Sequence, residues 1–324
     1  MNVLVVGGAG YIGSHTAKSL NKAGFNPIVF DNLSTGHRWA VRWGPLVEAD
    51  LANKPAIVQA LREYEIEAVV HFAANAYVGE SMQNPAKYFR NNVANMLNLL
   101  EAMQESSVKR IVFSSSCTTY GIPERIPIHE DFPQAAISPY GESKLMGEKM
   151  LKWFGEAYGL SWVALRYFNA SGADPDGETG EVHNPETHLI PLVIDAALSR
   201  RPPVQIFGTD YPTPDGTAIR DYIHVTDLAE AHVLALKYLL EGGPPTAFNL
   251  GTGQGHSVLE VIAAVERVGG CPVPAVEAPR RSGDPPALVA DPSKAQRVLG
   301  WEAAYKSMDQ IAETAWRFAI SRKQ

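Results

Sequence analysis

The segment Val3-Leu4-Val5-Val6-Gly7-Gly8-Ala9-Gly10-Tyr11-Ile12-Gly13 lies near the start of the chain and decides the expected fold class. Its apolar run suits a buried strand, its glycines are spaced G-x-x-G-x-x-G, and a helical pattern follows them. Glycines let the backbone turn tightly and approach a pyrophosphate closely, and the helix N-terminus offers free N–H groups to phosphate oxygens. A glycine triplet alone also occurs in turns without a ligand. Its place between a strand and a helix is what predicts a dinucleotide site.

Short apolar runs alternate with helical patterns over the first half of the chain. The runs suit strands buried on both faces of a parallel sheet, and they are Val3–Val6, Ile28–Phe30, Ala68–Phe72, Ile111–Phe113 and Val163–Leu165. The helical patterns are Ile12–Ala23, Pro55–Tyr64, Ala94–Gln104 and Lys144–Tyr158. This alternation predicts a Rossmann-type, doubly wound parallel α/β sheet with right-handed crossovers.

The sequence changes in character after about residue 168, where proline and glycine turn signals become frequent. Two further helical patterns, Ser257–Val268 and Met308–Ile320, lie in this part. We expect a dinucleotide-binding domain over residues 1–168 and a smaller α+β substrate-binding domain over residues 169–324. Some segments of the second part are expected to return and pack on the first.

Composition excludes several classes of protein. The 324 residues carry 28 Lys and Arg against 35 Asp and Glu, a net charge of −7, which argues against nucleic acid or an anionic membrane as the main partner. Two cysteines, Cys117 and Cys271, cannot form a disulfide framework. The first residues resemble a strand and not a signal peptide, so a cytoplasmic location is expected. The histidines, among them His183, His188 and His256, lack metal-site spacing, so no metal site is expected.

Two aspartates follow the second and third expected strands. Asp31 lies 21 residues after Gly10, where a carboxylate can accept hydrogen bonds from an adenosine ribose and repel a 2′-phosphate. This favours NAD over NADP, and Arg38 nearby does not outweigh it. Asp50 lies where a third strand would end and suits the adenine amino group. The alternative for both is an ordinary carboxylate of a turn or helix cap.

The segment Tyr140-Gly141-Glu142-Ser143-Lys144 has the pattern Y-x-x-x-K. On a helix, residues four apart share a face, so the lysine is expected to lower the pKa of the tyrosine and make it a proton acceptor near neutral pH. Ser116 or Thr118, which follow an expected strand, could share the proton with Tyr140. Alone, the pattern fits a surface tyrosine near a solvated lysine; with the glycine motif, it predicts a catalytic group.

Several motifs, in order, resemble those of the extended short-chain dehydrogenase/reductase family, and within it the UDP-glucose 4-epimerases. They are Gly7–Gly13, Asp31-Asn32, Ser114–Gly121, Ser138–Lys144, Arg166-Tyr167-Phe168-Asn169, Arg220-Asp221-Tyr222-Ile223-His224-Val225 and Pro279-Arg280-Arg281-Ser282-Gly283-Asp284. The match runs from residue 1 to beyond residue 290. The early motifs mark the superfamily and the later ones are more specific.

The resemblance implies an isomerase that holds NAD tightly and interconverts UDP-glucose and UDP-galactose through a transient 4-keto sugar. Tyr140 would take the proton of the sugar 4′-hydroxyl while hydride passes to the nicotinamide. Lys144 would bind the nicotinamide ribose. The keto sugar would turn over while its diphosphate stays bound, so that hydride returns to the other face.

The resemblance also implies two sets of binding residues, in addition to the catalytic group Tyr140, Lys144, Ser116 and Thr118. Cofactor contacts are expected from Gly7, Gly10, Tyr11, Ile12, Gly13, Asp31, Asn32, Asp50, Leu51, Phe72, Ala73, Ala74, Asn91, Tyr140, Lys144 and Phe168. Substrate contacts are expected from Ser116, Tyr140, Asn169, His188, Leu189, Gln205, Phe207, Arg220, Tyr222, Arg281, Asp284 and Leu288. Guanidinium groups also suit a diphosphate on chemical grounds, although Arg220 and Arg281 could instead pair with Asp221 and Asp284.

Three positions depart from the family pattern. Leu288 replaces a tyrosine that narrows the sugar pocket, so activity toward N-acetylated UDP-hexoses is expected as well. Ala76 replaces a lysine near the cofactor, and Gln205 replaces a smaller residue of the uridine pocket.

Four other functions remain as alternatives. Nucleotide-sugar dehydratases, and in part the decarboxylases, carry carboxylates where this chain has Cys117 and Thr118. A 4-epimerase of UDP-pentoses or UDP-uronates is a closer alternative. A NAD-sensing regulator could dispense with Tyr140 and Lys144, which are both present.

Relatives pair through helices such as 93–103 and 144–154, so a homodimer is expected, although these faces could equally be core.

Overall fold

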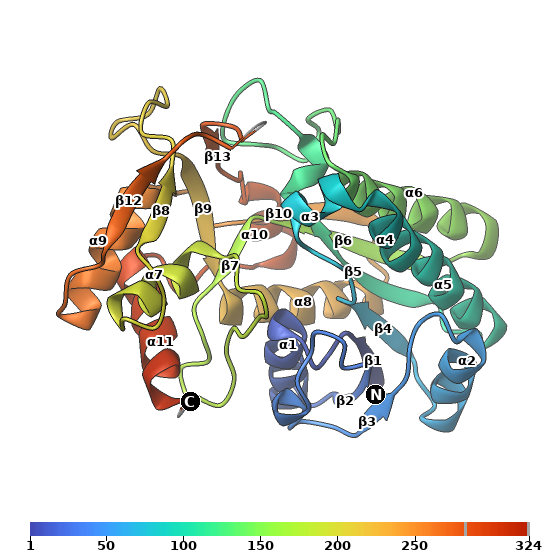
Figure 1. Ribbon diagram of the computed structural model, residues 1–324. Coiled ribbons are helices and arrows are strands. Elements are labelled where there is room, and N and C mark those ends of the chain that lie inside the picture. The colour runs from blue at the N-terminus through green and yellow to red at the C-terminus, as the bar shows by residue number, and fades with distance from the viewer. Residues whose placement is uncertain (282–283, 323–324) are drawn as a thin grey trace.

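The computed structural model describes residues 1–281 and 284–322. Among these residues, seven parallel strands form the main sheet in the order β10-β6-β5-β4-β1-β2-β3 (Figure 1). Their bounds are β1 Asn2–Val6, β2 Asn26–Asp31, β3 Leu46–Glu48, β4 Ala68–His71, β5 Arg110–Ser116, β6 Ser161–Tyr167 and β10 Thr246–Leu250. The predicted doubly wound parallel sheet is confirmed.

Helices cover both faces of this sheet because its strands are apolar on both sides. Val3 and Val5 of β1 face a core that includes Leu20 of α1 (Tyr11–Lys22) and Leu228 of α8 (Val225–Leu240). The alternate residues Leu4 and Val6 face the opposite core. That core is formed with α2 (Lys54–Glu63), α5 (Asn95–Glu105) and α6 (Pro139–Tyr158).

A second region contains shorter strands and its own core. Strand β9 (Ile219–His224) pairs with β7 (Asn169–Ser171), β11 (Gly255–Ser257) and β13 (Ala287–Leu288), and β8 (Val204–Phe207) pairs with β12 (Ala275–Ala278). Helices α7 (Leu189–Ala197), α9 (Val258–Gly269) and α11 (Met308–Ser321) share a hydrophobic core with β8. Figure 1 shows them gathered on the side away from α2 and α5.

The chain returns to the first sheet after entering the second region. Helix α8 packs on α1, and β10 pairs with β6 at the sheet edge, Phe248 opposite Leu165. Helix α10 (Ser293–Leu299) lies against β10. The expected domain division at residue 168 stays a prediction.

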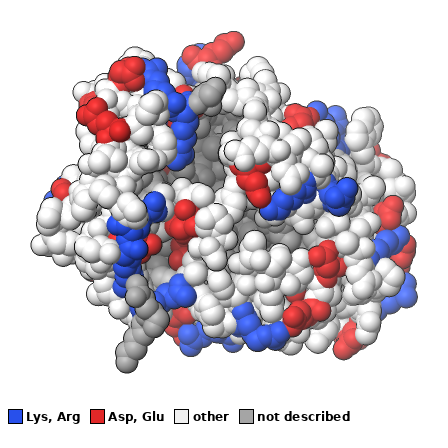
Figure 2. All heavy atoms as spheres, viewed as in Figure 1, with Lys and Arg blue, Asp and Glu red and all other residues white. Residues whose placement is uncertain are grey.

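Short helices complete the description: α3 (Val78–Gln83), α4 (Pro85–Tyr88), the π-helical η2 (Phe89–Ala94), and the 3-10 turns η1 (Arg38–Ala40) and η3 (Cys117–Tyr120). Within the described ranges, none of the helices has the length and apolar character needed to cross a membrane. Figure 2 shows acidic and basic side chains interspersed over one face of the molecule.

Candidate active site

The glycine motif forms the turn between β1 and α1. Gly7 has a positive φ of 81°, and a Cβ on it would lie 2.5 Å from the backbone nitrogen of Ala73. A Cβ on Gly13 would lie 2.2 Å from the carbonyl oxygen of Gly7. The cap residue Gly10 provides no side-chain hydrogen bond, so the first-turn N–H groups of α1 have no side-chain partner there. This turn therefore fits the pyrophosphate of a dinucleotide.

The two predicted adenosine-binding aspartates lie at the end of β2 and after β3, and Asp31 contacts the glycine turn. Asp31, at the end of β2, accepts hydrogen bonds from the backbone N–H of Ala9 at 3.0 Å and of Leu33 at 2.8 Å. Burial raises its pKa, and these hydrogen bonds oppose the shift. Asp50 accepts from Asn32 Nδ2 at 2.6 Å. Both aspartates therefore also accept hydrogen bonds within the chain, as expected for the alternative role of an ordinary turn carboxylate.

Other predicted cofactor residues come from the ends of neighbouring strands. Phe72, Ala73 and Ala74 follow β4, and the backbone N–H of Ala73 donates to Val6 of β1 at 3.1 Å. Asn91 lies in the π-helical turn, a geometry that often marks a functional site, and it bonds Asn92. The carboxyl ends of parallel strands lie on one side of a sheet, so Phe72, Ala73 and Ala74 lie on the same side as the glycine turn.

Tyr140 and Lys144 lie on the first turns of α6. The helix begins at the N-cap Ser138, whose hydroxyl accepts from the Gly141 N–H at 3.1 Å. A Cβ on Gly141 would lie 2.7 Å from the Thr118 carbonyl oxygen, so the glycine lets α6 approach the end of β5. This approach brings Tyr140 to Ser116.

Ser116 and Thr118 are linked at the end of β5. The Thr118 hydroxyl donates to Ser116 Oγ at 2.9 Å, and Ser116 has a side-chain hydrogen bond with Tyr140. Buried Lys144 donates to the carbonyl oxygen of Ser114 at 2.7 Å. The four predicted catalytic residues therefore share one site.

The expected lowering of the tyrosine pKa was wrong for the chain's own residues. Burial raises the pKa of Tyr140 to about 12, while the hydrogen bond with Ser116 opposes the shift. Burial also lowers the pKa of Lys144 to about 7. Desolvation disfavours the charged form of each group, and it outweighs the effect of their i, i+4 spacing.

A buried ion pair that the sequence analysis missed holds α6 on the sheet. Glu148 of α6 accepts from Arg166 of β6 at 2.6 Å and from the Ser115 hydroxyl of β5. The Arg166 guanidinium also donates to the Tyr120 hydroxyl at 2.8 Å. The resemblance motif contained Arg166, but spacing alone could not show its partner across the fold.

The predicted substrate residues line strands of the second region. Arg220 forms an ion pair with Asp284, and the Arg281 guanidinium lies 4.0 Å from the centre of the Phe207 ring. Asp221, named as the alternative partner of Arg220, instead accepts backbone N–H groups of Thr252, Gly253 and Ala290. Ser282 and Gly283 of the resemblance motif lie outside the described residues.

Strand pairing places the remaining substrate candidates. Asn169 of β7 is opposite Tyr222 of β9, and Leu288 of β13 is opposite Arg220. Leu288 also packs against a cluster that includes Phe168 and Cys117. Gln205 is exposed on β8, two residues before Phe207 and on the same face. Tyr222 is buried in the core of the second region.

The segment before α7 brings together four side chains that the sequence analysis did not connect. Glu181, His183, Glu186 and His188 lie with ligand-type atoms within 4.8 Å of one another. Burial alone would lower the pKa of both imidazoles, but the two carboxylates raise it, to about 9 for His183 and about 10 for His188. His188 and Leu189 form the start of α7.

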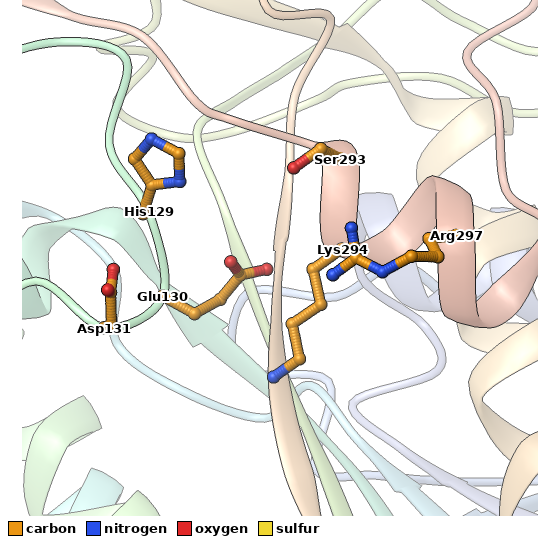
Figure 3. Close-up of a pocket in the computed structure, with 6 residues that line it drawn as sticks. All are labelled: His129, Glu130, Asp131, Ser293, Lys294 and Arg297. Atoms are coloured by element: carbon orange, nitrogen blue, oxygen red, sulfur yellow. The ribbon is translucent and has the colours of Figure 1, made fainter.

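Two cavities lie outside the predicted catalytic group. One of about 380 Å³ contains none of the predicted site residues (Figure 3). It is lined by His129, Glu130, Asp131, Ser293, Lys294 and Arg297. Its Glu130 accepts a hydrogen bond from the Asn249 N–H, and its Lys294 donates to Thr246 and Ala247. These charged side chains therefore hold β10 in place by hydrogen bonds. The other cavity, of about 400 Å³, borders Glu181, His183 and Glu186.

Comparisons with known proteins agree with this geometry. Residues 3–251 match the NAD dependent epimerase/dehydratase family. The UDP-glucose 4-epimerase of Lacticaseibacillus casei is 50% identical over 98% of this chain and 96% of its own, and that of Streptococcus mutans is 51% identical over 99% and 97%. A crystal structure of the Brucella ovis UDP-glucose 4-epimerase in complex with NAD has a TM-score of 0.96 and 55% identity over 98% of both chains. The chain therefore belongs to the NAD dependent epimerase/dehydratase family and is similar over nearly its whole length to UDP-glucose 4-epimerases.

Proposed function

We propose that this protein is a NAD-dependent 4-epimerase that interconverts UDP-glucose and UDP-galactose through a 4-keto sugar. The observation that carries the proposal is the grouping of Tyr140, Ser116 and Lys144 at the carboxyl end of β5, in the same parallel sheet whose strand β1 ends in the glycine turn. Relatives of about 50% identity over nearly the whole chain have this activity in their names.

The residues present fit NAD. The glycine turn leaves no room for a Cβ at Gly7 or Gly13, and Asp31 supplies a carboxylate where a 2′-phosphate would be repelled. When bound, NAD would supply the hydride transfer to and from the sugar, which the side chains cannot provide. Gly7, Gly13, Asp31 and Lys144 would hold it.

The side chains supply proton transfer. Tyr140 accepts the proton of the sugar 4′-hydroxyl and returns it, and Ser116 shares a hydrogen bond with it. With burial raising the pKa of Tyr140 to about 12, the phenolate needs positive charge nearby, and Lys144 lies one turn along the same helix.

The second region supplies a firm hold on the nucleotide. Arg220 and Arg281 offer two guanidinium groups to a diphosphate, and Phe207 and Gln205 share a strand face suited to the uracil ring. Epimerisation requires the sugar to turn while the diphosphate stays bound. Strong contacts at the nucleotide and weak ones at the hexose meet that requirement.

The dehydratase alternative is not supported by the residues after β5. Elimination of water needs an acid–base pair near the keto sugar, and this chain has Cys117 and Thr118 there. Burial raises the pKa of Cys117 to about 12, so the thiol stays protonated. Neither side chain supplies the second acid–base group.

The activity is tested by incubating the purified protein with UDP-galactose without added NAD and following the anomeric protons by NMR. We expect a steady UDP-glucose/UDP-galactose mixture. Tyr140→Phe should lower the rate about 10²–10⁴-fold while NAD stays bound, because a general acid–base group is lost. Tyr158→Phe, at the exposed end of the same helix, is the matched control. No turnover after NAD is supplied would exclude a hexose epimerase and favour UDP-pentoses or UDP-uronates.

We further propose that N-acetylated UDP-hexoses are substrates. Leu288 is smaller than tyrosine and packs against the cluster that contains Phe168. The UDP-Glc/GlcNAc 4-epimerase of Campylobacter jejuni is similar to this chain, with 40% identity and a TM-score of 0.87. Leu288→Tyr should reduce the rate with UDP-N-acetylglucosamine at least about tenfold and leave UDP-galactose turnover little changed, because one extra group in a pocket discriminates by about 1–3 kcal/mol. Equal losses with both sugars would contradict this.

We also propose a homodimer formed through α5 and α6. Leu97 of α5 is 39% exposed and Trp153 of α6 is 64% exposed, so both helices carry large apolar side chains that the chain itself does not cover.

A cytoplasmic location remains part of the proposal. The free thiols Cys117 and Cys271 suit a reducing compartment.

A further inference from the structure

The strongest unassigned feature is the cluster of Glu181, His183, Glu186 and His188, called here the His–Glu cluster. It lies in the segment that precedes α7. His188 Nδ1 is 2.8 Å from Glu181 Oε1 and 3.0 Å from Glu186 Oε1. His183 Nδ1 is 3.3 Å from Glu181 Oε1 and 3.5 Å from Glu186 Oε2. Two ring nitrogens and two carboxylates therefore face a common centre.

These separations match those of a small coordination shell. Zinc binds imidazole nitrogen and carboxylate oxygen at about 2.0–2.1 Å, and tetrahedral ligands at that radius lie about 3.3–3.4 Å from one another. The nitrogen–oxygen distances in the cluster, from 2.8 to 3.5 Å, lie around that value. A cation needs only small side-chain shifts to bind all four groups.

One buried nitrogen atom of the cluster lacks a hydrogen-bond partner. His183 Nδ1 is buried and has no well-directed hydrogen bond, although both carboxylates are close. A buried polar atom without a partner is costly. A cation between the imidazole and the carboxylates would satisfy it.

The groups are also held in place by their surroundings. Glu186 Oε1 accepts the backbone N–H groups of Thr187 and His188, both at 2.8 Å. The His183 ring has edge contacts with Tyr11 and Tyr77 at ring distances of 6.4 and 6.2 Å. Such support orients the ligands of metal sites.

The chain offers a contrast in its acidic group of Asp174, Asp176 and Glu178. There Lys18 Nζ lies 2.7–2.8 Å from each carboxylate and fills the space between them. The His–Glu cluster receives no Lys or Arg among its described ion pairs, and its two negative charges face only imidazoles. A divalent cation would take the place of the two imidazole protons, so the charge of the cluster would stay balanced when the metal binds.

We propose that Glu181, His183, Glu186 and His188 form a binding site for a divalent transition metal, with Zn²⁺ as the best match. Imidazole ligands favour zinc and its neighbours over Mg²⁺ or Ca²⁺, which prefer all-oxygen sites. The cavity beside Glu181 and His183 and the 40% exposed side chain of His188 provide access from solvent.

A metal there would have a positioning role. It would cross-link the segment that leads into α7 and fix it against Tyr11 of the glycine turn and Tyr77. His188 and Leu189 at the start of α7 are expected substrate contacts, so the metal would set the position of that wall of the site.

The test uses the untagged, NAD-loaded protein after EDTA treatment and dialysis. Zn²⁺ binding is measured by calorimetry, bound metal is counted by mass spectrometry, and Co²⁺ is titrated while visible absorption is recorded. His183→Ala and Glu186→Gln remove one ligand each. His256→Ala is the matched control, because His256 also faces a glutamate, Glu260, at 3.6 Å and is similarly exposed.

We expect one Zn²⁺ per chain for the wild type and His256→Ala, with affinity at least about 100-fold lower in both ligand variants. A Co²⁺ absorption band of low-coordinate type should appear only where the metal binds. Circular dichroism and NAD content check that each variant is folded. Absence of stoichiometric Zn²⁺ in the wild type would reduce the cluster to an ion-pair network and overturn the proposal. Unchanged affinity in both ligand variants would place the metal elsewhere, for example at Cys271, and overturn it equally. These readouts do not depend on sugar turnover.

Discussion

Lys144 illustrates how, at the scale of a residue, burial governs the chemistry of the site. The Y-x-x-x-K pattern was enough to place Tyr140 and Lys144 together, because helical spacing is a local property. It could not give the direction of the tyrosine pKa shift, because burial depends on β5 and α6 together. The meeting of Glu181 with His188 was not predicted for the same reason, since it depends on the path of a loop.

Lys144→Met should stabilise the NAD-free protein at low pH. Burial lowers the pKa of Lys144 from its usual 10.5 to about 7, so between these values the unfolded chain binds more protons than the folded one. The wild type therefore gains stability as the pH rises from 7 towards 10.5, and below pH 7 it carries the full cost of the buried charge, on the order of a few kcal/mol. The variant lacks that cost.

Thermal unfolding of both proteins between pH 6 and pH 9.5 measures the effect. We expect the melting temperature of Lys144→Met to exceed that of the wild type at pH 6 by several degrees and the difference to shrink as the pH rises. A difference that does not depend on pH would contradict the assignment to the lysine charge.

At the scale of elements, long periodic segments were predictable and irregular ones were not. The patterns at Ile12–Ala23 and Met308–Ile320 correspond to α1 and α11 within one residue at each end. Helix α6 begins at Pro139, five residues before the expected pattern, because Ser138 caps it and Pro139 suits its first turn. The π-helical turn and the two-residue β13 depend on tertiary contacts and have no periodic signal.

Gly13→Ala should strongly reduce NAD retention without unfolding the sheet. The added Cβ would lie 2.2 Å from the Gly7 carbonyl oxygen, so the turn between β1 and α1 must widen. We expect bound NAD per chain to fall at least about tenfold, because the backbone no longer approaches the pyrophosphate. Gly79→Ala, in α3, is the control, since its Cβ would meet no atom within 4 Å. NAD is released by acid and quantified; full NAD content in Gly13→Ala would refute the expected role of the turn.

At the scale of the whole molecule, the two regions carry different groups of candidate residues, and the chain passes from the first region to the second and back. The first sheet carries the cofactor and catalytic candidates, and β7, β8, β9 and β13 carry the nucleotide candidates. The sequence predicted both regions and the return of later segments, but not that β10 would become an edge strand of the first sheet. Helix α10 packs against both α8 and β10, and such contacts between segments far apart in sequence leave no local signal.

Trp153→Glu should separate the proposed dimer. An exposed tryptophan that becomes buried at an interface centre contributes about 2 kcal/mol or more, which corresponds to about a 30-fold rise in the dissociation constant when it is lost. Light scattering coupled to gel filtration over a dilution series gives the mass. Ile320→Glu is the control, because Ile320 is 52% exposed on α11, away from α5 and α6. A monomeric wild type, or a dimer that persists in Trp153→Glu at low concentration, would contradict the proposed interface.

The position of β10 has a consequence for synthesis on the ribosome. The edge of β6 acquires its neighbour only when residues 246–250 have emerged, although β6 itself ends at Tyr167. For about eighty residues of translation the nascent chain therefore presents an unpaired strand edge, the kind of surface on which chains associate wrongly. A pause or early stop in that interval would leave a sheet that exposes its hydrogen-bonding groups, and chaperone demand should be greatest there.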